Sequence, residues 1–374
     1  MGSVQSPERL RAEIDEIRRE PLSCAGVRTS KEGDEFGDKL GLRPAGAMVD
    51  EGNSEDRLVC VTSGLSYLGR AIVNRLLLRG YSVRLVITKE EEAREEELRE
   101  TESWGPRNNG ISVVVVEKLS DAEGLSEAFN GCSCVLHTAA FIDPAGLSGY
   151  TKSMAEIEAK TCENVMVACA RTASVRNCVL TSSLLACIWR DTSQGDLSTI
   201  VNHHCRSDES VCLDKKLWYA LGKLRAEKAA WRIAHQQIRR FKLVTICPAL
   251  ITGPQFSLKN PTPTIAYLKG FQEMFADGLL ATVDVHRLAE AHVGVLEAMN
   301  KGSAFGRYVC FDRVIRRQDE AEILAGETGM QMNPPALGDD ASGRNHLFRF
   351  ELSNVKLSGL LSRTQRCSDP CHVN

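Results

Sequence analysis

A tyrosine and a lysine four residues apart could carry out acid–base chemistry in this chain. Tyr219 and Lys223 stand in the run Tyr-Ala-Leu-Gly-Lys, and in a helix this spacing places both side chains on one face. Tyrosine, with an ordinary pKa of about 10, exchanges protons poorly at neutral pH, but a nearby ammonium group favours the phenolate and lowers that pKa. The pair therefore predicts a proton-transfer site. An amphipathic helix whose lysine reaches solvent is the alternative interpretation.

Hydroxyl groups at the end of an upstream apolar run could serve the same reaction. Thr181, Ser182 and Ser183 follow residues 175–180, which have the composition of a strand. A serine hydroxyl at a strand end can orient a substrate carbonyl, although Ser and Thr also serve ordinary turns there. Because the hydroxyls precede the Tyr–Lys pair in a regular alternation of strands and helices, we favour a shared site.

A turn between a predicted strand and a predicted helix could bind phosphate. It spans residues 62–69, Thr-Ser-Gly-Leu-Ser-Tyr-Leu-Gly. Backbone N–H groups at a helix N-terminus bind a pyrophosphate when no side chain stands in the way. Ser63 and Ser66 crowd the turn, so we expect weak binding, and Ser66 could cap the helix. A plain strand–turn–helix connection is the alternative. The residues assigned to this cofactor site are Thr62, Gly64, Ser66, Tyr67, Leu68 and Gly69.

Strands and helices alternate from residue 58 onward. The predicted strands are 58–62, 82–87, 111–116, 134–139, 175–182 and 241–247, and the predicted helices are 67–79, 90–102, 121–130, 154–172 and 219–235. Continuous runs of β-branched residues separated by helices indicate a parallel sheet that is covered on both faces. The sequence therefore predicts a doubly wound α/β (Rossmann) fold, whose ligands bind at the carboxyl ends of the strands.

The chain divides into three parts by composition. Residues 24–57 are rich in Gly, Asp, Glu, Lys and Ser, which predicts a disordered extension over 1–56. A short amphipathic helix over 7–20 is compatible with this, as a frayed segment or as a docking helix for a partner. The remaining predicted parts are a Rossmann core from 57 to about 251, a smaller C-terminal substrate lobe mainly over 252–365 with 189–217, and a tail over 366–374.

Bulk composition excludes several classes of protein. The 374 residues carry a net charge of -3, which argues against a nucleic-acid partner. No apolar run approaches the roughly 18 residues that span a membrane, and the acidic N-terminus is unlike a signal or transit peptide. We therefore predict a cytoplasmic protein.

The 14 cysteines predict free thiols instead of disulfides or metal ligands. No pair of Cys-x-x-Cys units is present, and His203-His204 lacks the spacing of a metal site, so no metal is predicted. Many of the cysteines occupy positions where small hydrophobic residues would be expected, which is typical of buried thiols. These are Cys132, Cys134, Cys162, Cys169, Cys178 and Cys247.

Several stretches together resemble a known family. They are residues 135–139 (Val-Leu-His-Thr-Ala), 177–183, 216–223, 245–250, 284–289 and 306–310. Over roughly residues 57–365 the chain resembles the cinnamoyl-CoA reductase and dihydroflavonol reductase group of plant extended short-chain dehydrogenases/reductases. The resemblance implies reduction of an acyl-CoA or another carbonyl compound with NADP, NAD being the alternative cofactor.

The resemblance also implies roles for individual residues. Tyr219 would be the proton donor, Lys223 its partner and a donor to the nicotinamide ribose, and Ser183 the carbonyl-binding hydroxyl, with Ser182 as the alternative. Further cofactor-binding residues would be Lys89, Thr138, Ala139, Pro248 and Ile251.

The chain departs from the family pattern at several positions. Leu217, Ala220 and Leu221 replace the residues that the lignin-pathway enzymes carry beside the catalytic tyrosine, with the loss of two polar groups. Thr88 stands where an arginine would bind the 2′-phosphate of NADP, and Lys118 stands where an aspartate would meet adenine. These departures and the altered glycine turn favour an alternative to the reductase. The alternative is a nucleotide-binding pseudoenzyme or an interaction protein on the same fold.

Overall fold

The core of the structure, a computed structural model, is a seven-stranded parallel sheet. The structure describes residues 57–89, 91–92, 110–138, 150–191, 198–236, 241–329 and 348–366. The strands of the sheet are β1 (Leu58–Thr62), β2 (Ser82–Thr88), β3 (Ile111–Val116), β4 (Cys134–His137), β5 (Asn177–Thr181), β7 (Lys242–Pro248) and β10 (Gly306–Cys310). Their order is β10-β7-β5-β4-β1-β2-β3.

The strand order creates a crevice next to β1. The chain runs outward from β1 through β2 to β3, then returns to β4 on the other side of β1 and continues through β5 and β7 to β10. Connections after β1 and β4 therefore leave in opposite directions. In open α/β sheets, ligands bind outside the carboxyl ends of the strands at such a reversal.

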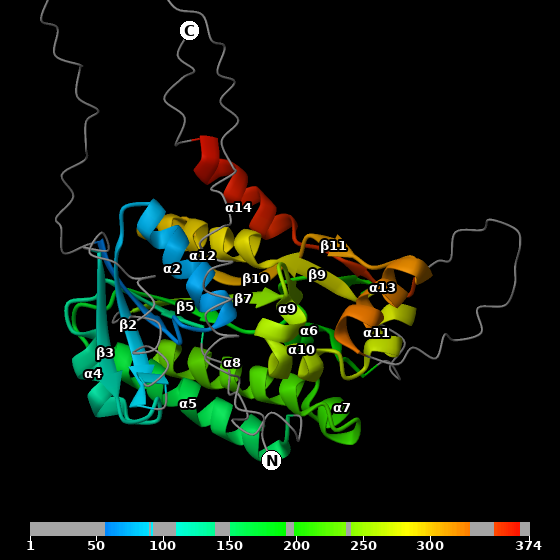
Figure 1. Ribbon diagram of the computed structural model, residues 1–374, viewed down its shortest axis with the longest axis horizontal. Helices are drawn as coiled ribbons and strands as arrows, with labels where there is room; N and C mark the ends of the chain where they lie inside the picture. The colour runs from blue at the N-terminus through cyan, green and yellow to red at the C-terminus, as the bar shows by residue number, and fades with distance from the viewer. Residues whose placement is uncertain are drawn as a thin grey trace, which may run out of the picture.

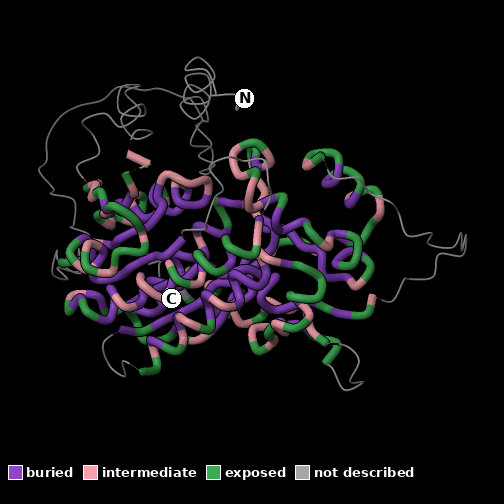
Figure 2. The backbone as a smooth tube through the Cα atoms, turned by 90° about the horizontal axis from the view of Figure 1, so that it is seen from below, coloured by how far each residue is buried: buried purple, intermediate pink, exposed green. Residues whose placement is uncertain are grey.

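Helices cover both faces of the sheet (Figure 1). On one face lie α2 (Tyr67–Leu78) and α12 (Val285–Asn300), with α14 (Val355–Arg366) against α12. On the other lie α4 (Ala122–Phe129), α5 (Lys152–Arg171) and α8 (Trp218–Gln236). Figure 2 shows the buried backbone concentrated in the centre of the molecule.

Local sequence explains these elements. Val59, Cys60 and Val61 in β1 are fully buried, as expected of a strand that is covered on both faces. Asp121 caps α4 by accepting a hydrogen bond from the backbone N–H of Glu123 at 3.1 Å, and Asp284 caps α12 in the same way. Such capping side chains fix the point at which each strand gives way to a helix.

Shorter elements gather beyond the carboxyl edge of the large sheet. A three-stranded sheet has the order β11-β9-β8 and a two-stranded sheet pairs β12 with β6. The elements are α6 (Leu185–Ile188), β6 (Ile200–Val201), α7 (Glu209–Asp214), β8 (Leu250–Thr252), α9 (Phe256–Lys259), α10 (Pro261–Tyr267), α11 (Phe271–Ala276), β9 (Ala281–Asp284), β11 (Arg313–Val314), α13 (Gln318–Thr328) and β12 (Glu351–Leu352).

The predicted fold class is confirmed, with one correction to the organisation. The six predicted strands form within a few residues of their expected bounds, but the sheet takes its seventh strand, β10, from beyond residue 251. The core therefore does not end near 251, because α12 returns the chain to the sheet before β10. Residues 1–56, 93–100 and 367–374 lie outside the described residues, and with them the predicted extension, most of the 90–102 helix and the tail.

Two composition-based expectations can be compared with the structure. The six cysteines predicted to be buried thiols are buried and free. Among the helices of the described ranges, none has both the length and the apolar character needed to cross a membrane.

Candidate active site

Polar side chains from adjacent strands meet at the carboxyl edge of the sheet. Thr62 at the end of β1 forms a hydrogen bond to His137 of β4 (Oγ1 to Nδ1, 2.9 Å), and Thr138 donates its hydroxyl proton to the Thr62 carbonyl at 2.6 Å. At β5, the Ser182 N–H donates to the Ile246 carbonyl of β7 at 2.8 Å. These bonds hold the ends of β1, β4, β5 and β7 at the edge where the crevice is expected.

The turn after β1 begins α2 beside this crevice. Ser66 is the N-cap of α2, and its hydroxyl oxygen accepts a hydrogen bond from the Gly69 N–H at 3.1 Å, so the predicted cap is confirmed. A Cβ at Gly69 would lie 2.2 Å from the Ser63 carbonyl oxygen, so only glycine fits there. Ser63 itself has a left-handed backbone (φ 54°), which is unfavourable for a residue with a Cβ.

The other residues of this turn play packing roles. Leu68 is buried in the core, and a Cβ at Gly64 would lie 2.5 Å from a methyl group of Leu85. The Tyr67 hydroxyl donates to the Pro254 carbonyl at 3.4 Å, which links α2 to the segment after β8. The helix N-terminus therefore lies close to the segment that follows Ile251.

At the end of β2, the charged side chains of Lys89 and Glu91 already interact with other residues of the protein. The exposed Lys89 is ion-paired with Glu117, and Glu91 accepts hydrogen bonds from the backbone N–H (2.9 Å) and the hydroxyl (3.3 Å) of Thr88. Lys89 lies where the sequence placed it but would have to exchange Glu117 for a phosphate. Ala139 lies outside the described residues.

Tyr219 and Lys223 lie on one face of α8, as their spacing predicts. Tyr219 is half-buried in the first turn of the helix, whereas Lys223 is 4% exposed. The Lys223 ammonium nitrogen lies 5.6 Å from the centre of the Tyr219 ring. The two groups are therefore close enough for the lysine charge to affect the phenol.

Glu158, which the sequence analysis missed, forms an ion pair with Lys223. The Glu158 side chain is 5% exposed, and its Oε1 lies 2.5 Å from the Lys223 Nζ. Its other oxygen accepts a hydrogen bond from the Tyr150 hydroxyl. The Tyr150 ring meets the Tyr219 ring edge-on, with 5.1 Å between their centres.

This arrangement corrects the expected direction of the Tyr219 ionisation. Burial raises the pKa of Tyr219, Lys223 lowers it and Glu158 raises it, and the net direction is upward. Burial lowers the pKa of Lys223, but Glu158 and Tyr219 outweigh this, so its pKa lies above the usual value. Tyr219 is consequently a phenol and Lys223 an ammonium at neutral pH.

Ser182 and Ser183 have different partners. The Ser182 hydroxyl donates to the fully buried carboxylate of Glu227 at 3.1 Å. The Ser183 oxygen accepts from the Leu185 N–H at 3.2 Å, and within the described residues no acceptor takes its proton. Ser183 therefore has a proton to donate to a substrate carbonyl, and Ser182 does not.

A small cavity adjoins Lys223. Its volume is about 10 Å³, close to the least that holds one water molecule. Burial lowers the pKa of His137 in its wall to about 3, so this histidine is neutral. The lining residues are His137, Glu158, Cys162, Leu180, Thr181, Ser182, Lys223 and Ala226.

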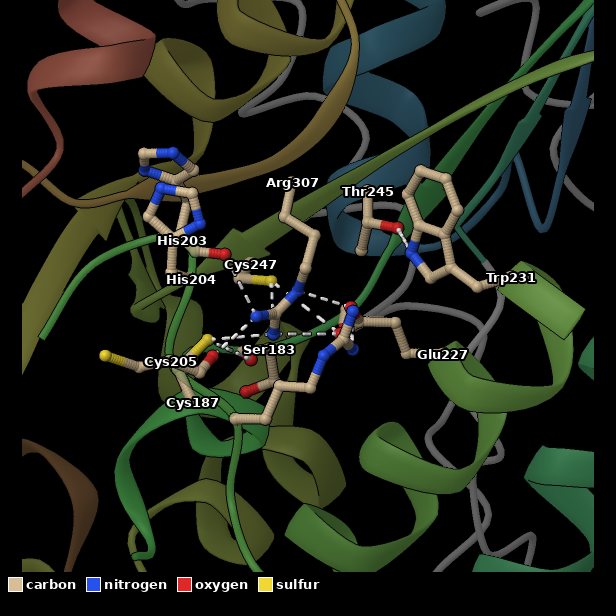
Figure 3. A network of polar contacts seen from close by, with 12 residues as sticks. Ser183, Cys187, His203, His204, Cys205, Glu227, Trp231, Thr245, Cys247 and Arg307 are labelled. Carbon is tan, nitrogen blue, oxygen red and sulfur yellow. Dashed lines mark hydrogen bonds and ion pairs between the residues drawn. The ribbon is translucent and has the colours of Figure 1, made fainter. Parts of the chain in front are cut away.

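A buried arginine fixes the strands behind the site (Figure 3). Arg307 of β10 forms an ion pair with Glu227, and its Nη2 lies 3.2 Å from the Cys187 sulfur and 3.7 Å from the Cys247 sulfur. It also donates to the carbonyl of His203 at 3.1 Å. One side chain thereby joins α8, α6, β7 and the loop before α7.

A helical pattern could have indicated Glu158. Met154, Glu158, Cys162 and Val165 follow the spacing of one helix face, and all four are buried in α5. An acid within an apolar stripe requires a buried partner. The sequence could not identify that partner as Lys223, because the two helices meet only in the tertiary structure.

The fold and this site define a class of protein, the NAD(P)-dependent oxidoreductases of the short-chain dehydrogenase/reductase type. The model of the 3-beta hydroxysteroid dehydrogenase/isomerase family matches residues 60–303, and the chain belongs to that family. Cinnamoyl-CoA reductase 1 of Petunia hybrida is 33% identical over 309 residues (81% of this chain, 86% of the relative). Cinnamoyl-CoA reductase 1 of Arabidopsis thaliana is 32% identical over 320 residues (83% and 87%).

More distant relatives and solved structures agree with this placement. Tetraketide alpha-pyrone reductase 1 of Arabidopsis thaliana is 28% identical over 81% of this chain and 90% of its own. A yeast methylglyoxal/isovaleraldehyde reductase complexed with NADPH has a TM-score of 0.61 at 20% identity, covering 82% of this chain and 93% of that one. Vestitone reductase from alfalfa has a TM-score of 0.56 at 22% identity, covering 81% and 91%. The two structures support the fold.

Proposed function

We propose that this chain reduces the carbonyl of a CoA thioester with NADPH, with a hydroxycinnamoyl-CoA as the first candidate substrate. The observation that carries the proposal is that Tyr219 and Lys223 lie together on α8, and that Ser182, the neighbour of Ser183 at the end of β5, donates to Glu227 of the same helix. The cinnamoyl-CoA reductases among the relatives support the substrate class. A simple ketone or aldehyde is the alternative, supported by the tetraketide alpha-pyrone reductase relative.

The residues present fit a nicotinamide dinucleotide. The α2 N-terminus, with the close approach of Gly69 to Ser63, leaves backbone N–H groups for a pyrophosphate. Lys89 would meet the 2′-phosphate, Lys223 would donate to the nicotinamide ribose, and Thr138, Ala139, Pro248 and Ile251 would line the cleft. NAD is the alternative, because Glu91 stands at the end of β2 and Glu117, which follows β3, is paired with Lys89.

The proposed mechanism assigns one task to each of three side chains. The cofactor supplies the hydride when bound. Ser183 donates a hydrogen bond to the carbonyl oxygen, Tyr219 gives that oxygen its proton, and Lys223 stays charged beside the developing phenolate. A thioester would give a hemithioacetal, whose hydroxyl would return its proton to the Tyr219 phenolate as the C–S bond breaks, leaving an aldehyde and the CoA thiolate. A ketone or aldehyde would yield an alcohol.

A second candidate function is nucleotide binding without turnover. It is favoured by the left-handed Ser63 in the pyrophosphate turn and by the carboxylates at the end of β2. The intact Ser183, Tyr219 and Lys223 set favours the enzyme.

A titration with NADPH and NADH, followed by a substrate panel, tests the proposal. We expect saturable NADPH binding, and NADPH oxidation with a hydroxycinnamoyl-CoA. Oxidation with ketones alone would favour a ketone as the substrate class, and binding without oxidation across the panel would favour the pseudoenzyme.

We propose a cytoplasmic location, in keeping with the free cysteines of the described residues.

A further inference from the structure

Glu158 is a buried acid that the proposed mechanism does not use. It lies on α5, where this helix packs along α8, and its side chain is 5% exposed. A buried carboxylate is costly unless both oxygens find partners. Here one oxygen faces the Lys223 ammonium at 2.5 Å and the other accepts from Tyr150.

The partners of Glu158 are also the neighbours of the proposed acid. Lys223 lies 5.6 Å from the centre of the Tyr219 ring, and the Tyr150 ring contacts Tyr219 edge-on. The phenol therefore has neighbours from two helices. Lys223 lies on its own helix, α8, whereas Glu158 lies on α5, and Tyr150 is the residue before the N-cap of α5.

We propose that Glu158 is a positioning residue, whose carboxylate fixes the Lys223 ammonium and offsets its charge, so that Tyr219 works as a phenol. The proposal rests on the proposed use of Tyr219 as the proton donor. An unopposed ammonium favours the phenolate, which is the form that the reverse oxidation needs. Lysine has three N–H donors, so an ion pair with Glu158 leaves two for a ribose.

Among the described residues, Lys223 and Glu158 are the charged groups that shift the pKa of Tyr219. His137 is neutral, since burial lowers its pKa to about 3, and burial raises the pKa of Cys162. Burial likewise raises the pKa of Tyr150 and Tyr267. Glu227, one turn beyond Lys223, is paired with Arg307 and Arg206.

The experiment measures the ionisation of Tyr219 directly, by NMR of isotope-labelled tyrosine, with Tyr219→Phe to assign the signal. In the unmodified chain we expect the midpoint of the Tyr219 titration to lie above the ordinary tyrosine value of about 10. Glu158→Gln removes the charge and keeps the shape, so the midpoint should fall by roughly 1–3 pH units. Glu158→Asp, which keeps the charge, should restore a high midpoint. Glu156→Gln is the matched control, because Glu156 is exposed on the same helix.

An unchanged midpoint in Glu158→Gln would overturn the proposal. Because burial also raises the Tyr219 midpoint, only a neutral variant is decisive. If Glu158→Gln does not fold, Glu158→Met takes its place: a midpoint below that of the unmodified chain supports the proposal, and an equal midpoint overturns it. The titration needs neither cofactor nor substrate, so its outcome is independent of whether the reductase function holds. Where turnover is measured, kcat/KM should fall at high pH as Tyr219 loses its proton. In Glu158→Gln this fall should occur at lower pH than in the unmodified chain.

Discussion

At the scale of single residues, burial and two neighbours of opposite charge determine the direction of the pKa shift of the proposed acid. Lys223 stabilises the Tyr219 phenolate and Glu158 opposes this, while burial favours the neutral phenol. The spacing of Tyr219 and Lys223 was visible in the sequence because it is local to one helix. The partner of Glu158 was not visible, because it depends on how α5 packs against α8.

The two adjacent serines should respond differently to removal of the hydroxyl. Ser183→Ala should lower kcat by about 10²–10³ if Ser183 donates to the carbonyl, with little change in stability. Ser182→Ala removes a donor from the buried carboxylate of Glu227 and should lower the free energy of unfolding by about 1–3 kcal/mol. Steady-state kinetics and urea unfolding of both variants measure this. The reverse pattern would assign the carbonyl-binding role to Ser182.

At the scale of elements, the turn between β1 and α2 contains two serines that look alike in sequence but have different structural roles. Both Ser63 and Ser66 were expected to crowd a pyrophosphate. In the structure Ser66 stabilises α2 as its cap, whereas Ser63 adopts a left-handed backbone. The sequence could identify the turn, but it could not show which serine costs stability, since this depends on φ.

Single substitutions should distinguish the two serines. Ser63→Gly relieves the left-handed strain and should raise the free energy of unfolding by about 1 kcal/mol, and it should tighten NADPH binding. Ser66→Ala loses the cap and should lower the free energy of unfolding by about 1 kcal/mol. Denaturant unfolding and NADPH titration test both changes. Destabilisation by Ser63→Gly would contradict the backbone assignment.

The Arg307–Glu227 pair joins several elements behind the site. Breaking it by Arg307→Met leaves a buried, incompletely paired carboxylate and should cost about 3–5 kcal/mol of unfolding free energy. Replacing both residues by apolar ones should recover part of that loss. The control is Arg317→Met, since Arg317 forms an exposed pair with Asp319, and we expect no measurable effect there. Equal stability of Arg307→Met and the control would show that the pair does not hold these elements together.

Strands whose pattern is contained within their own residues were predicted from the sequence, and a strand that depends on distant packing was not. Strands such as β1 and β7 were predicted because each contains several β-branched residues within a largely apolar run. β10 was not assigned to the sheet, because its five residues pair with β7 only after α12 has packed against the core. The carboxyl-edge location of the site followed from the fold class.

At the scale of the whole molecule, a large parallel core positions the site. The strand order around β1 places the α2 N-terminus, the β5 end and the first turn of α8 at one edge. The described core begins at Arg57, immediately before β1. The first 56 residues have little apolar content for packing on this core.

Removal of residues 1–56 should therefore leave the fold stable. We expect the shortened chain to melt within a few degrees of the full chain and to bind NADPH equally well. Differential scanning calorimetry and cofactor titration measure these quantities. A large fall in Tm would show that the N-terminal segment packs on the core.

The rate of NADPH oxidation in Tyr219→Phe tests the central claim most directly. The substitution removes one hydroxyl and almost no volume, so the melting temperature and NADPH affinity should be unchanged. If Tyr219 is the proton donor, kcat with a hydroxycinnamoyl-CoA should fall by about 10²–10⁴. Lys223→Ala should lower both the rate and the NADPH affinity, which separates loss of the acid from loss of its partner. Undiminished oxidation in a folded, NADPH-binding Tyr219→Phe variant would contradict the mechanism.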